Sequence, residues 1–474
     1  MLRRIELRCP DSLVPHLATV LQSLAVLFQS EFDVKPLQRS SVATLSAGGP
    51  SRVELPIPDL DDWMTGAIEI TVWRGIPLPH RGPIAGAYPD LLGLTYFVFM
   101  DIEERRQEAA NGEGKFDVRR SVFAPVLQVN YLDLIVEQIR RDLGIQEPRF
   151  GAIILTHDLD LIDHRAYPRT ATCSPSLREI AGHLRAFRLR SALLRLRDSA
   201  RSLVAFIQQG TEKFEFAAWA GAEAERGFRS VFFVFAPERL RTFPQDAWYA
   251  FTTRNRSAPW LTLRAVLARL LRQGFEVAPH FSRSADYRLD LLCAECHSIR
   301  SSLNVKLESV RNHWVWIRYS DWPEYLKVLD LRYDFNTVAI GYRKGTTYPY
   351  LLRNGGTWAV STTFADDLAF KASNGFSMTP EAGLACIERQ LRDVERFGGC
   401  IALSFHPAED GPPGTLSIPA KLPFYREVLR LLSDRGLSVL LPREALERLW
   451  TGARVTYGHS AARGAFSREP SPLE

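Results

Sequence analysis

The spacing of apolar residues changes character close to Glu147-Pro148. Before that point strand-like and helical patterns mix, which is typical of a small α+β domain. Gly144 is a plausible C-terminal cap for the last predicted helix of this part, residues 131–143. The predicted segments are a strand at 4–8, a helix within 13–28, alternating runs at 53–57 and 67–73, a continuous apolar run at 91–100 and a helix at 131–143.

After that point short β-rich runs recur and are separated by helical stretches. Eight such runs in succession predict an α/β fold, with a distorted (β/α) barrel favoured and a smaller α+β domain before it. The runs are residues 151–156, 230–235, 275–281, 310–317, 334–341, 357–364, 401–405 and 437–441. The predicted domains are 1–147, a barrel over 148–450 with a helical insertion at about 165–227, and a Gly-, Ala-, Ser- and Pro-rich tail over 451–474 that we expect to be disordered.

Composition narrows the class of protein. Hydrophobic residues make up 46% of the 474 positions and charged residues 24%, which excludes a disordered chain, a collagen or a coiled coil. The net charge of +5 is spread along the chain and gives little support to nucleic-acid binding. Six cysteines are too few for a disulfide scaffold of this length, and the apolar stretch 13–28 is interrupted and lacks a signal-peptide pattern. We therefore expect no transmembrane helix and a cytoplasmic location.

One segment, residues 184–201, carries six arginines among leucines. Such a basic amphipathic helix can lie on an anionic membrane surface as a peripheral contact. An exposed helix in the insertion between the first two barrel strands explains the pattern equally simply, and we favour it because solvated arginine faces are common.

Candidate chemistry gathers where the predicted strands end. Barrel enzymes place their catalytic residues at the carboxyl ends of the strands. Six of the eight runs end in, or contain, carboxylates, imidazoles or guanidinium groups, more than scattered surface polarity would give. These residues are His157, Asp158 and Asp160 on the first run, His280 on the third, Arg311 and His313 on the fourth, Arg343 on the fifth, Asp366 and Asp367 on the sixth and His406 on the seventh.

Asp158 and Asp160 are two positions apart, so a persisting strand would present both carboxylates on one face. One could then bind a cation while the other stays free as a base, and carboxylate with imidazole suits Zn²⁺ and other divalent metals. Either aspartate alone could instead cap the following helix; the companion histidines favour the site.

The order and spacing of these motifs resemble the NodB-like polysaccharide deacetylases, carbohydrate esterase family 4. The resemblance is to bacterial members whose first motif has the form T-H-D-x-D and which carry an N-terminal domain of unknown function. It covers most of the chain. It depends on the apolar run 91–100 with Glu103-Glu104, on 114–116 and on 121–125 in the first domain, and on 156–160, 232–235, 280–282 with Glu295, 310–313, 341–350 and 403–407 in the second.

The resemblance implies a role for each matching residue. Asp158 matches the general base, Asp160 the metal-binding acid displaced by one position, and His280 the first metal histidine. The usual second histidine is absent, since Ser284 stands there, and His313 on the neighbouring strand is the nearest replacement. Arg343 matches the arginine that orients the base, Asp366 or Asp367 could orient the acid, and His406 matches the general acid.

The function implied is hydrolysis of an N- or O-acetyl group on a sugar or glycan precursor. A divalent metal ion, with Zn²⁺ first among the candidates, would be held by Asp160, His280 and His313. The altered second motif keeps an alternative open: a catalytically inactive barrel that binds a glycan or a partner in polysaccharide assembly. Retention of Asp158, Arg343 and His406 favours the enzyme.

Other signals point to structure rather than chemistry. The run Cys293-Ala294-Glu295-Cys296-His297 matches the haem c attachment pattern, but its apolar spacing favours a helix with buried thiols. Strand alternation turns His157 away from Asp158, which indicates a structural histidine. Trp314 and Trp316 are interpreted as packing residues.

Overall fold

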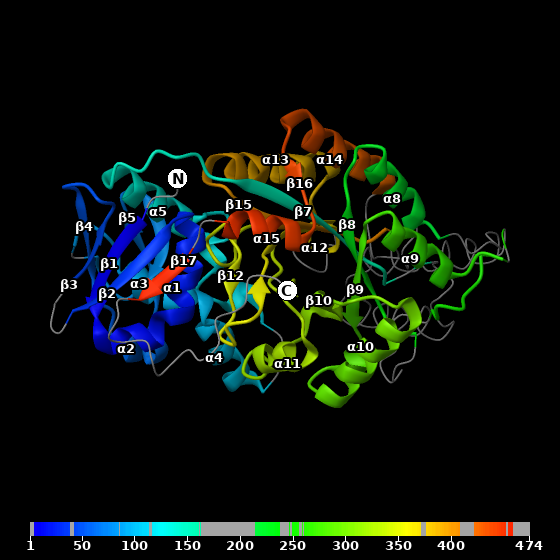
Figure 1. The fold of residues 1–474 in the computed structure, drawn as a ribbon, viewed down its shortest axis with the longest axis horizontal. Helices are drawn as coiled ribbons and strands as arrows, with labels where there is room; N and C mark the ends of the chain where they lie inside the picture. The colour runs from blue at the N-terminus through cyan, green and yellow to red at the C-terminus, as the bar shows by residue number, and fades with distance from the viewer. Residues whose placement is uncertain are drawn as a thin grey trace, which may run out of the picture.

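The computed structural model describes residues 4–37, 42–84, 86–112, 116–160, 162, 214–237, 246, 249–255, 258, 260–370, 376–407, 421–451 and 454–457. The arginine-rich segment 184–201 and most of the predicted insertion lie outside these residues. Figure 1 shows a smaller sheet domain beside a larger α/β domain.

The smaller domain is built on a five-stranded sheet in the order β17-β2-β1-β3-β4. β1 alternates, so that Ile5, Leu7 and Cys9 are buried while their neighbours are not. β1 and β2 run parallel and are joined by α1, whereas β3 and β4 continue the sheet antiparallel. The elements are β1 (Arg4–Pro10), α1 (Val14–Phe28), β2 (Glu31–Leu37), β3 (Val42–Ser46), β4 (Arg52–Pro56), α2 (Leu60–Thr65), the hairpin β5 (Glu69–Trp73) and β6 (Ile76–His80), α3 (Leu91–Phe99), α4 (Ile102–Asn111) and α5 (Tyr131–Asp142).

α1 is a core helix of this domain. Among the described residues, the stretch 11–28 is the one helix long and apolar enough to cross a membrane, yet 61% of it is buried inside the protein. It packs against α3, α5 and β12. The cytoplasmic location stays a prediction.

The larger domain is a curled sheet whose central strands are all parallel. The path is β12-β13-β11-β10-β9-β8-β7-β15-β14, with β16 also paired to β7 and only β12 antiparallel. A bridge between Val338 and Thr362 brings the segment after β11 against β14, so the sheet curls toward a barrel. The predicted fold class is thus confirmed. The strands are β7 (Gly151–Asp158), β8 (Ser230–Val234), β9 (Glu276–Phe281), β10 (Ser309–Asn312), β11 (Tyr333–Asp334), β12 (Tyr350–Leu351), β13 (Trp358–Ala359), β14 (Thr362–Ala365), β15 (Gly399–Phe405) and β16 (Ser438–Val439).

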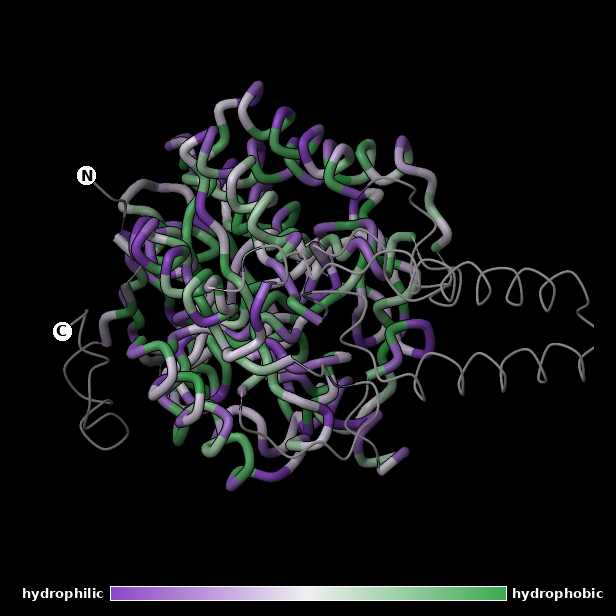
Figure 2. Tube along the Cα trace, turned by 90° about the vertical axis from the view of Figure 1, so that its right-hand side faces the viewer, coloured by the Kyte–Doolittle hydropathy of each residue, from purple (hydrophilic) through white to green (hydrophobic). Residues whose placement is uncertain are grey.

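Helices cover the outside of this sheet. In Figure 2 the turns of the outer helices alternate between polar and apolar residues. α13 shows the reason, since its buried residues recur every three or four positions, for example Ile387, Leu391 and Val394. The helices are α8 (Phe216–Ala224), α9 (Leu263–Arg272), α10 (Leu289–Leu303), α11 (Trp322–Leu329), α12 (Asp366–Phe370), α13 (Pro380–Phe397), α14 (Lys421–Arg435) and α15 (Pro442–Trp450).

The apolar run 91–100, whose type of element the pattern left open, contains the buried helix α3, which has no polar face to mark its period. The structure corrects two predicted strands. The fourth and fifth barrel strands are shorter than predicted, because a tight turn at His313–Val315 ends β10 and a loop follows β11.

The predicted disordered tail is also wrong in part. Residues 454–457 form β17 (Arg454–Tyr457), which pairs in parallel with β2 of the first domain, as the red arrow beside the blue sheet shows in Figure 1. The end of the described chain therefore returns to the sheet from which it started.

Candidate functional site

The site forms where neighbouring parallel strands end at one edge of the sheet. β7 pairs with β8 and β15, β8 with β9, and β9 with β10, where Arg311 is opposite His280. On the other side Phe405, the last residue of β15, is opposite His157 of β7. Side chains at these carboxyl ends therefore converge.

Asp160 lies at the centre of three imidazoles. Its Oδ1 is 3.0 Å from Nε2 of His280, and its Oδ2 is 3.7 Å from Nε2 of His313 and 3.6 Å from Nε2 of His406. Burial raises the pKa of Asp160, but the neighbouring histidines outweigh burial and hold it well below its usual range. The structure thus brings together the three predicted metal ligands and the predicted general acid.

The other ring nitrogen of two of these histidines is already used. Nδ1 of His280 is 3.0 Å from the carbonyl oxygen of Arg311, which can only accept, so Nδ1 must carry the proton. Nδ1 of His313 is 3.0 Å from Oδ1 of the buried Asp246, which accepts in the same way. In their neutral forms both rings therefore turn an Nε2 lone pair toward Asp160.

His406 is held by a carboxylate as well. Its Nδ1 is 2.6 Å from Oδ1 of Asp366, and its backbone N–H donates to Oδ2 of the same residue at 3.0 Å. Burial lowers the pKa of His406, but the charges of Asp366, Asp367 and Asp160 outweigh burial and raise it to about 10. The imidazole is thus protonated near neutral pH, as a proton donor requires.

Asp158 is oriented by an arginine, but not by the one predicted. Nη1 of Arg311 donates to Oδ1 of Asp158 at 2.7 Å, and the same guanidinium donates to the hydroxyls of Ser404 and Thr362 and to the carbonyl of Phe335. Arg311 is buried inside the curled sheet. The other carboxylate oxygen of Asp158 is 3.8 Å from Nε2 of His406.

The predicted role of Arg343 therefore needs correction. Its guanidinium donates to Glu104 at 2.7 Å and to the hydroxyl of Tyr319 at 2.9 Å, in the contact between the two domains. The physical reason is that β11 ends at Asp334, and the loop that follows carries Arg343 toward α4 instead of keeping it at a strand end.

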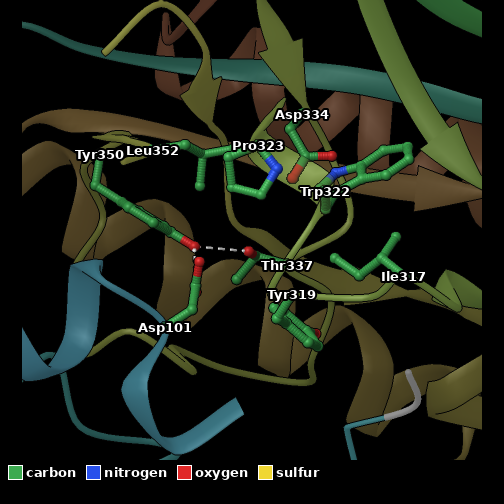
Figure 3. Close-up of a pocket in the computed structure, with 9 residues that line it drawn as sticks. All are labelled: Asp101, Ile317, Tyr319, Trp322, Pro323, Asp334, Thr337, Tyr350 and Leu352. Carbon is green, nitrogen blue, oxygen red and sulfur yellow. Dashed lines mark hydrogen bonds between the residues drawn. The ribbon is translucent and has the colours of Figure 1, made fainter. Parts of the chain in front are cut away.

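Arg343 belongs to a second buried cluster, which we call the interdomain cluster: Asp101, Glu104, Arg343 and Lys344. Nζ of Lys344 donates to Asp101 at 2.7 Å and to Glu104 at 2.6 Å. Burial raises the pKa of Glu104, but Lys344 and Arg343 outweigh it and the net pKa is lowered. A small cavity adjoins the cluster; Figure 3 shows its lining, with the Tyr350 hydroxyl bonded to Thr337 and facing Asp101. The lining residues are Asp101, Ile317, Tyr319, Trp322, Pro323, Asp334, Thr337, Tyr350 and Leu352.

The residues around Asp160 fit a divalent cation. Two imidazoles with their Nδ1 protons committed and one carboxylate form a donor set of the kind that binds Zn²⁺. Oδ1 of Asp160 is buried and has no hydrogen-bond partner, although Nε2 of His280 is only 3.0 Å away. A carboxylate oxygen facing a lone pair at that distance needs a proton or a cation between them.

Among the described residues, the group whose ligand atoms have the mutual spacing of a metal site is a neighbouring one. Ligand atoms of Asp366, Asp367 and His406 lie within 4.8 Å of one another. Both oxygens of Asp366, however, already accept hydrogen bonds from His406. We therefore interpret this group as the support of the His406 imidazole, and place the candidate cation site at Asp160.

The surroundings of His157 and of the Cys293–His297 segment agree with their interpretation as structural, except that only one of the two thiols is buried. His157 lies on the outer face of β7, where Nε2 is 2.6 Å from Glu223 and the ring stacks on Phe232. The Cys293–His297 segment lies in helix α10, with Cys296 buried but Cys293 exposed.

Trp314 differs from its interpretation as a packing residue. It is 49% exposed and its ring is 5.9 Å from that of His313. Trp314 and Val315 have backbone φ angles of 62° and 56°, which are strained for such residues. Strain of this kind is typical of functional sites, where the surrounding structure holds it in place.

Two residues of the site, Arg311 and Asp246, have roles that the sequence does not predict. Arg311 was noted on its strand but not assigned to Asp158, because the motif pointed to Arg343. Asp246 follows no predicted strand, and no local pattern connects it with His313.

Comparison with known proteins gives structural matches alone. No family model matches the sequence, and no curated protein matches it. A protein from Mycobacterium smegmatis assigned as a polysaccharide deacetylase is 16% identical, with a TM-score of 0.40 over 64% of this chain and 92% of that chain. An allantoinase is 8% identical, with a TM-score of 0.37 over 64% and 90%.

A third match is a protein from Bordetella bronchiseptica assigned as a polysaccharide deacetylase involved in O-antigen biosynthesis. It is 14% identical, with a TM-score of 0.25 over 64% of this chain and 91% of that chain. Similarities of this size say nothing about activity, so the function below is derived from the geometry of the site.

Proposed function

We propose that the protein is a metal-dependent hydrolase that removes an N- or O-acetyl group from a sugar or glycan precursor. The observation that carries the proposal is the convergence of three Nε2 atoms, from His280, His313 and His406, on Asp160. Each of these rings is fixed from behind through Nδ1. Packing alone does not require three imidazoles to aim at one carboxylate.

Asp160, His280 and His313 would hold the cation. A divalent ion at this position would polarise an acyl carbonyl and lower the pKa of a water. Asp160 is suited to the open side of such a site, because its side chain is 28% exposed whereas both histidines are buried.

Proton transfer is divided between Asp158 and His406. Oδ1 of Asp158 is bound by Arg311, which leaves Oδ2 on the side of His406 to accept a proton from the attacking water. His406, protonated and held by Asp366, is placed to donate a proton to the departing amine or alcohol. Two groups with opposite proton affinities in one site are the usual arrangement for acid–base hydrolysis.

A carbohydrate substrate is supported by Trp314. A half-exposed indole beside a candidate ligand offers a flat apolar face for a sugar ring, with the acetyl group directed at the cation site. An inactive glycan-binding barrel would use the same indole. It would not need Asp158 and His406 to approach within 3.8 Å with their partners in place, which favours the enzyme.

The test uses the full-length protein with metal analysis and acetate release from N- and O-acetylated oligosaccharides. We expect about one divalent ion per chain, and hydrolysis that a chelator abolishes. His313→Ala should remove bound metal and hydrolysis together. The matched control is His297→Ala, because His297 is exposed on α10.

Two results would contradict the proposal. Full metal content in His313→Ala would exclude His313 as a ligand. Stoichiometric metal with saturable glycan binding but no acetate release from any substrate would favour the inactive binding protein.

A further inference from the structure

The carboxylate that accepts a hydrogen bond from Nδ1 of His313 belongs to Asp246, 67 positions earlier in the chain. Several hydrogen bonds fix its position. Asp246 is 1% exposed, and both of its oxygens accept hydrogen bonds. Oδ1 accepts from Nδ1 of His313 at 3.0 Å and from the backbone N–H of Arg283 at 2.8 Å. Oδ2 accepts from the backbone N–H of Ser284 at 3.1 Å and from its hydroxyl at 2.8 Å.

These bonds connect the two strands that carry the histidines. Ser284 lies four residues after His280, in the turn that ends β9. His280 in turn donates through Nδ1 to the carbonyl of Arg311, two residues before His313 on β10. His313 is therefore held by Asp246, which is anchored just after β9, the strand of His280. His280 is held by the Arg311 carbonyl on β10, the strand that leads to His313.

His313 needs such support more than His280 does. His280 lies within β9 and its backbone is fixed by the sheet, whereas His313 is the first residue beyond β10. The two residues after it, Trp314 and Val315, have left-handed backbone conformations that cost energy. The position of the His313 side chain is thus fixed less by its own backbone than that of the His280 side chain.

We propose that Asp246 is a positioning residue for His313 and that Ser284 is the anchor of Asp246. This inference rests on the proposed function, since it concerns the affinity of the Asp160 site for a cation. Asp246 fixes the Nδ1–H tautomer and the ring orientation of His313, so that Nε2 is presented to the cation. Ser284 holds Oδ2 of Asp246 through two bonds and so prevents the carboxylate from rotating away.

The test is metal affinity in the full-length protein, measured with Zn²⁺ in competition with a chromogenic chelator and with Co²⁺ by visible absorption. Asp246→Asn should weaken Zn²⁺ binding about 10- to 100-fold, as loss of a partner behind a metal-bound histidine usually does. Ser284→Ala should weaken it less, because the backbone N–H of residue 284 remains. Asp246→Glu should restore part of the loss.

The matched control is Asp290→Asn, because Asp290 is an exposed carboxylate paired with Arg288 at the start of α10. This control should bind Zn²⁺ with wild-type affinity. Thermal unfolding of the metal-free variants separates lost affinity from lost folding.

The possible failures can be told apart. If wild-type protein and His313→Ala bind Zn²⁺ equally or not at all, the proposed function fails. If His313→Ala loses the metal while Asp246→Asn keeps wild-type affinity, the positioning role fails alone.

Should Asp246→Asn not fold, the wild-type protein supplies the answer by NMR. Long-range ¹H–¹⁵N correlation should show His313, assigned by its absence in His313→Ala, as the Nδ1–H tautomer. The opposite tautomer would overturn the inference.

Discussion

Two buried clusters of charged residues, one in the contact between the two domains and one at the strand ends of the larger domain, differ in how their charges are balanced. In the interdomain cluster two carboxylates, Asp101 and Glu104, face two cations, Arg343 and Lys344, at 2.6–2.7 Å. Positive and negative charges cancel within the cluster. Such a group of paired charges connects the two domains.

The cluster around Asp160 is not balanced in this way. Four carboxylates, Asp158, Asp160, Asp246 and Asp366, are accompanied by the guanidinium of Arg311, by the ammonium of Lys421 beside His406 and by three imidazoles. If the imidazoles at the candidate cation site are neutral, the surplus is negative, as a divalent cation would require. Burial of charged groups therefore does not by itself identify a functional site. An uncompensated charge beside side chains whose ligand atoms point at one position does.

The largest expected effect separates catalysis from metal binding within the second cluster. Asp158→Asn should lower the rate of acetate release about 10²- to 10⁴-fold, the usual contribution of a general base. Its metal content should stay at the wild-type level, because Asp158 is bound by Arg311 and is not one of the proposed ligands. Steady-state kinetics and metal analysis of the same preparation measure both quantities.

A loss of metal from Asp158→Asn would place that carboxylate among the ligands. Unchanged hydrolysis would remove it from the mechanism. Asp290→Asn serves again as the exposed carboxylate control.

The next effect belongs to the interdomain cluster. Glu104→Gln leaves Arg343 and Lys344 buried without their shared carboxylate, which should lower the free energy of unfolding by about 3–5 kcal/mol. Chemical denaturation measures this loss, and metal content should not change. Glu388→Gln is the control, because that exposed carboxylate pairs with Arg392 and Arg435 at the surface, where such pairs contribute about 0–1 kcal/mol.

A Glu104→Gln variant of normal stability that has lost metal or activity would contradict the distinction between the two clusters. The interdomain cluster would then be part of the functional site.

A smaller effect follows from ligand binding to the folded state. Zn²⁺ at 100 times its dissociation constant should stabilise the protein by about 2.7 kcal/mol. The same increment should appear in Glu104→Gln, whose damage lies in the other cluster, and should be absent from His280→Ala. Denaturation with and without Zn²⁺ tests this, and an increment that survives in His280→Ala would show that the ion binds elsewhere.

The sequence predicted those parts of the fold and site that depend on local pattern. Asp158 and Asp160 lie together as predicted, since both carboxylates approach the same His406 nitrogen, although β7 ends at Asp158 and does not continue to Asp160 as the period-two argument assumed. Runs of buried residues predicted the strands that position His280 and His406. These features follow from residues adjacent along the chain, so pattern was sufficient.

The remaining features depend on contacts between distant segments. β17 pairs with β2 more than 400 positions away, as with the bond from Thr456 to Phe32. Val455, Thr456 and Tyr457 are good strand formers, but a run of four residues inside a tail rich in Gly, Ala and Ser is too short to predict a strand.

The resemblance pointed to Arg343 as the partner of Asp158, and only the path of the loop after β11 shows that Arg311 takes this place. Asp246 has no local sequence signal, because its proposed role depends only on its contacts with His313 and with the turn at Arg283 and Ser284, which are distant in the sequence.

The smallest effect concerns the opening of the site. The interdomain cluster is closed, since Phe116 and Tyr319 cover the guanidinium of Arg343, whereas Trp314 stands half-exposed beside His313. If that indole receives a sugar ring, Trp314→Ala should raise KM about fivefold, equivalent to about 1 kcal/mol of aromatic contact.

Metal affinity and kcat of Trp314→Ala should stay close to the wild type, because the indole supplies neither a ligand nor a proton. Steady-state kinetics on an acetylated oligosaccharide measure KM and kcat separately, with Val72→Ala in the exposed part of the N-terminal hairpin as the control. A small acetyl ester without a sugar ring should be hydrolysed equally by both variants, since it cannot use the indole. An unchanged KM for the oligosaccharide would contradict a role of Trp314 in sugar binding. An equal loss on the small ester would indicate instead that the strained turn at Trp314 supports His313, and that the indole matters for the cation site rather than for its substrate.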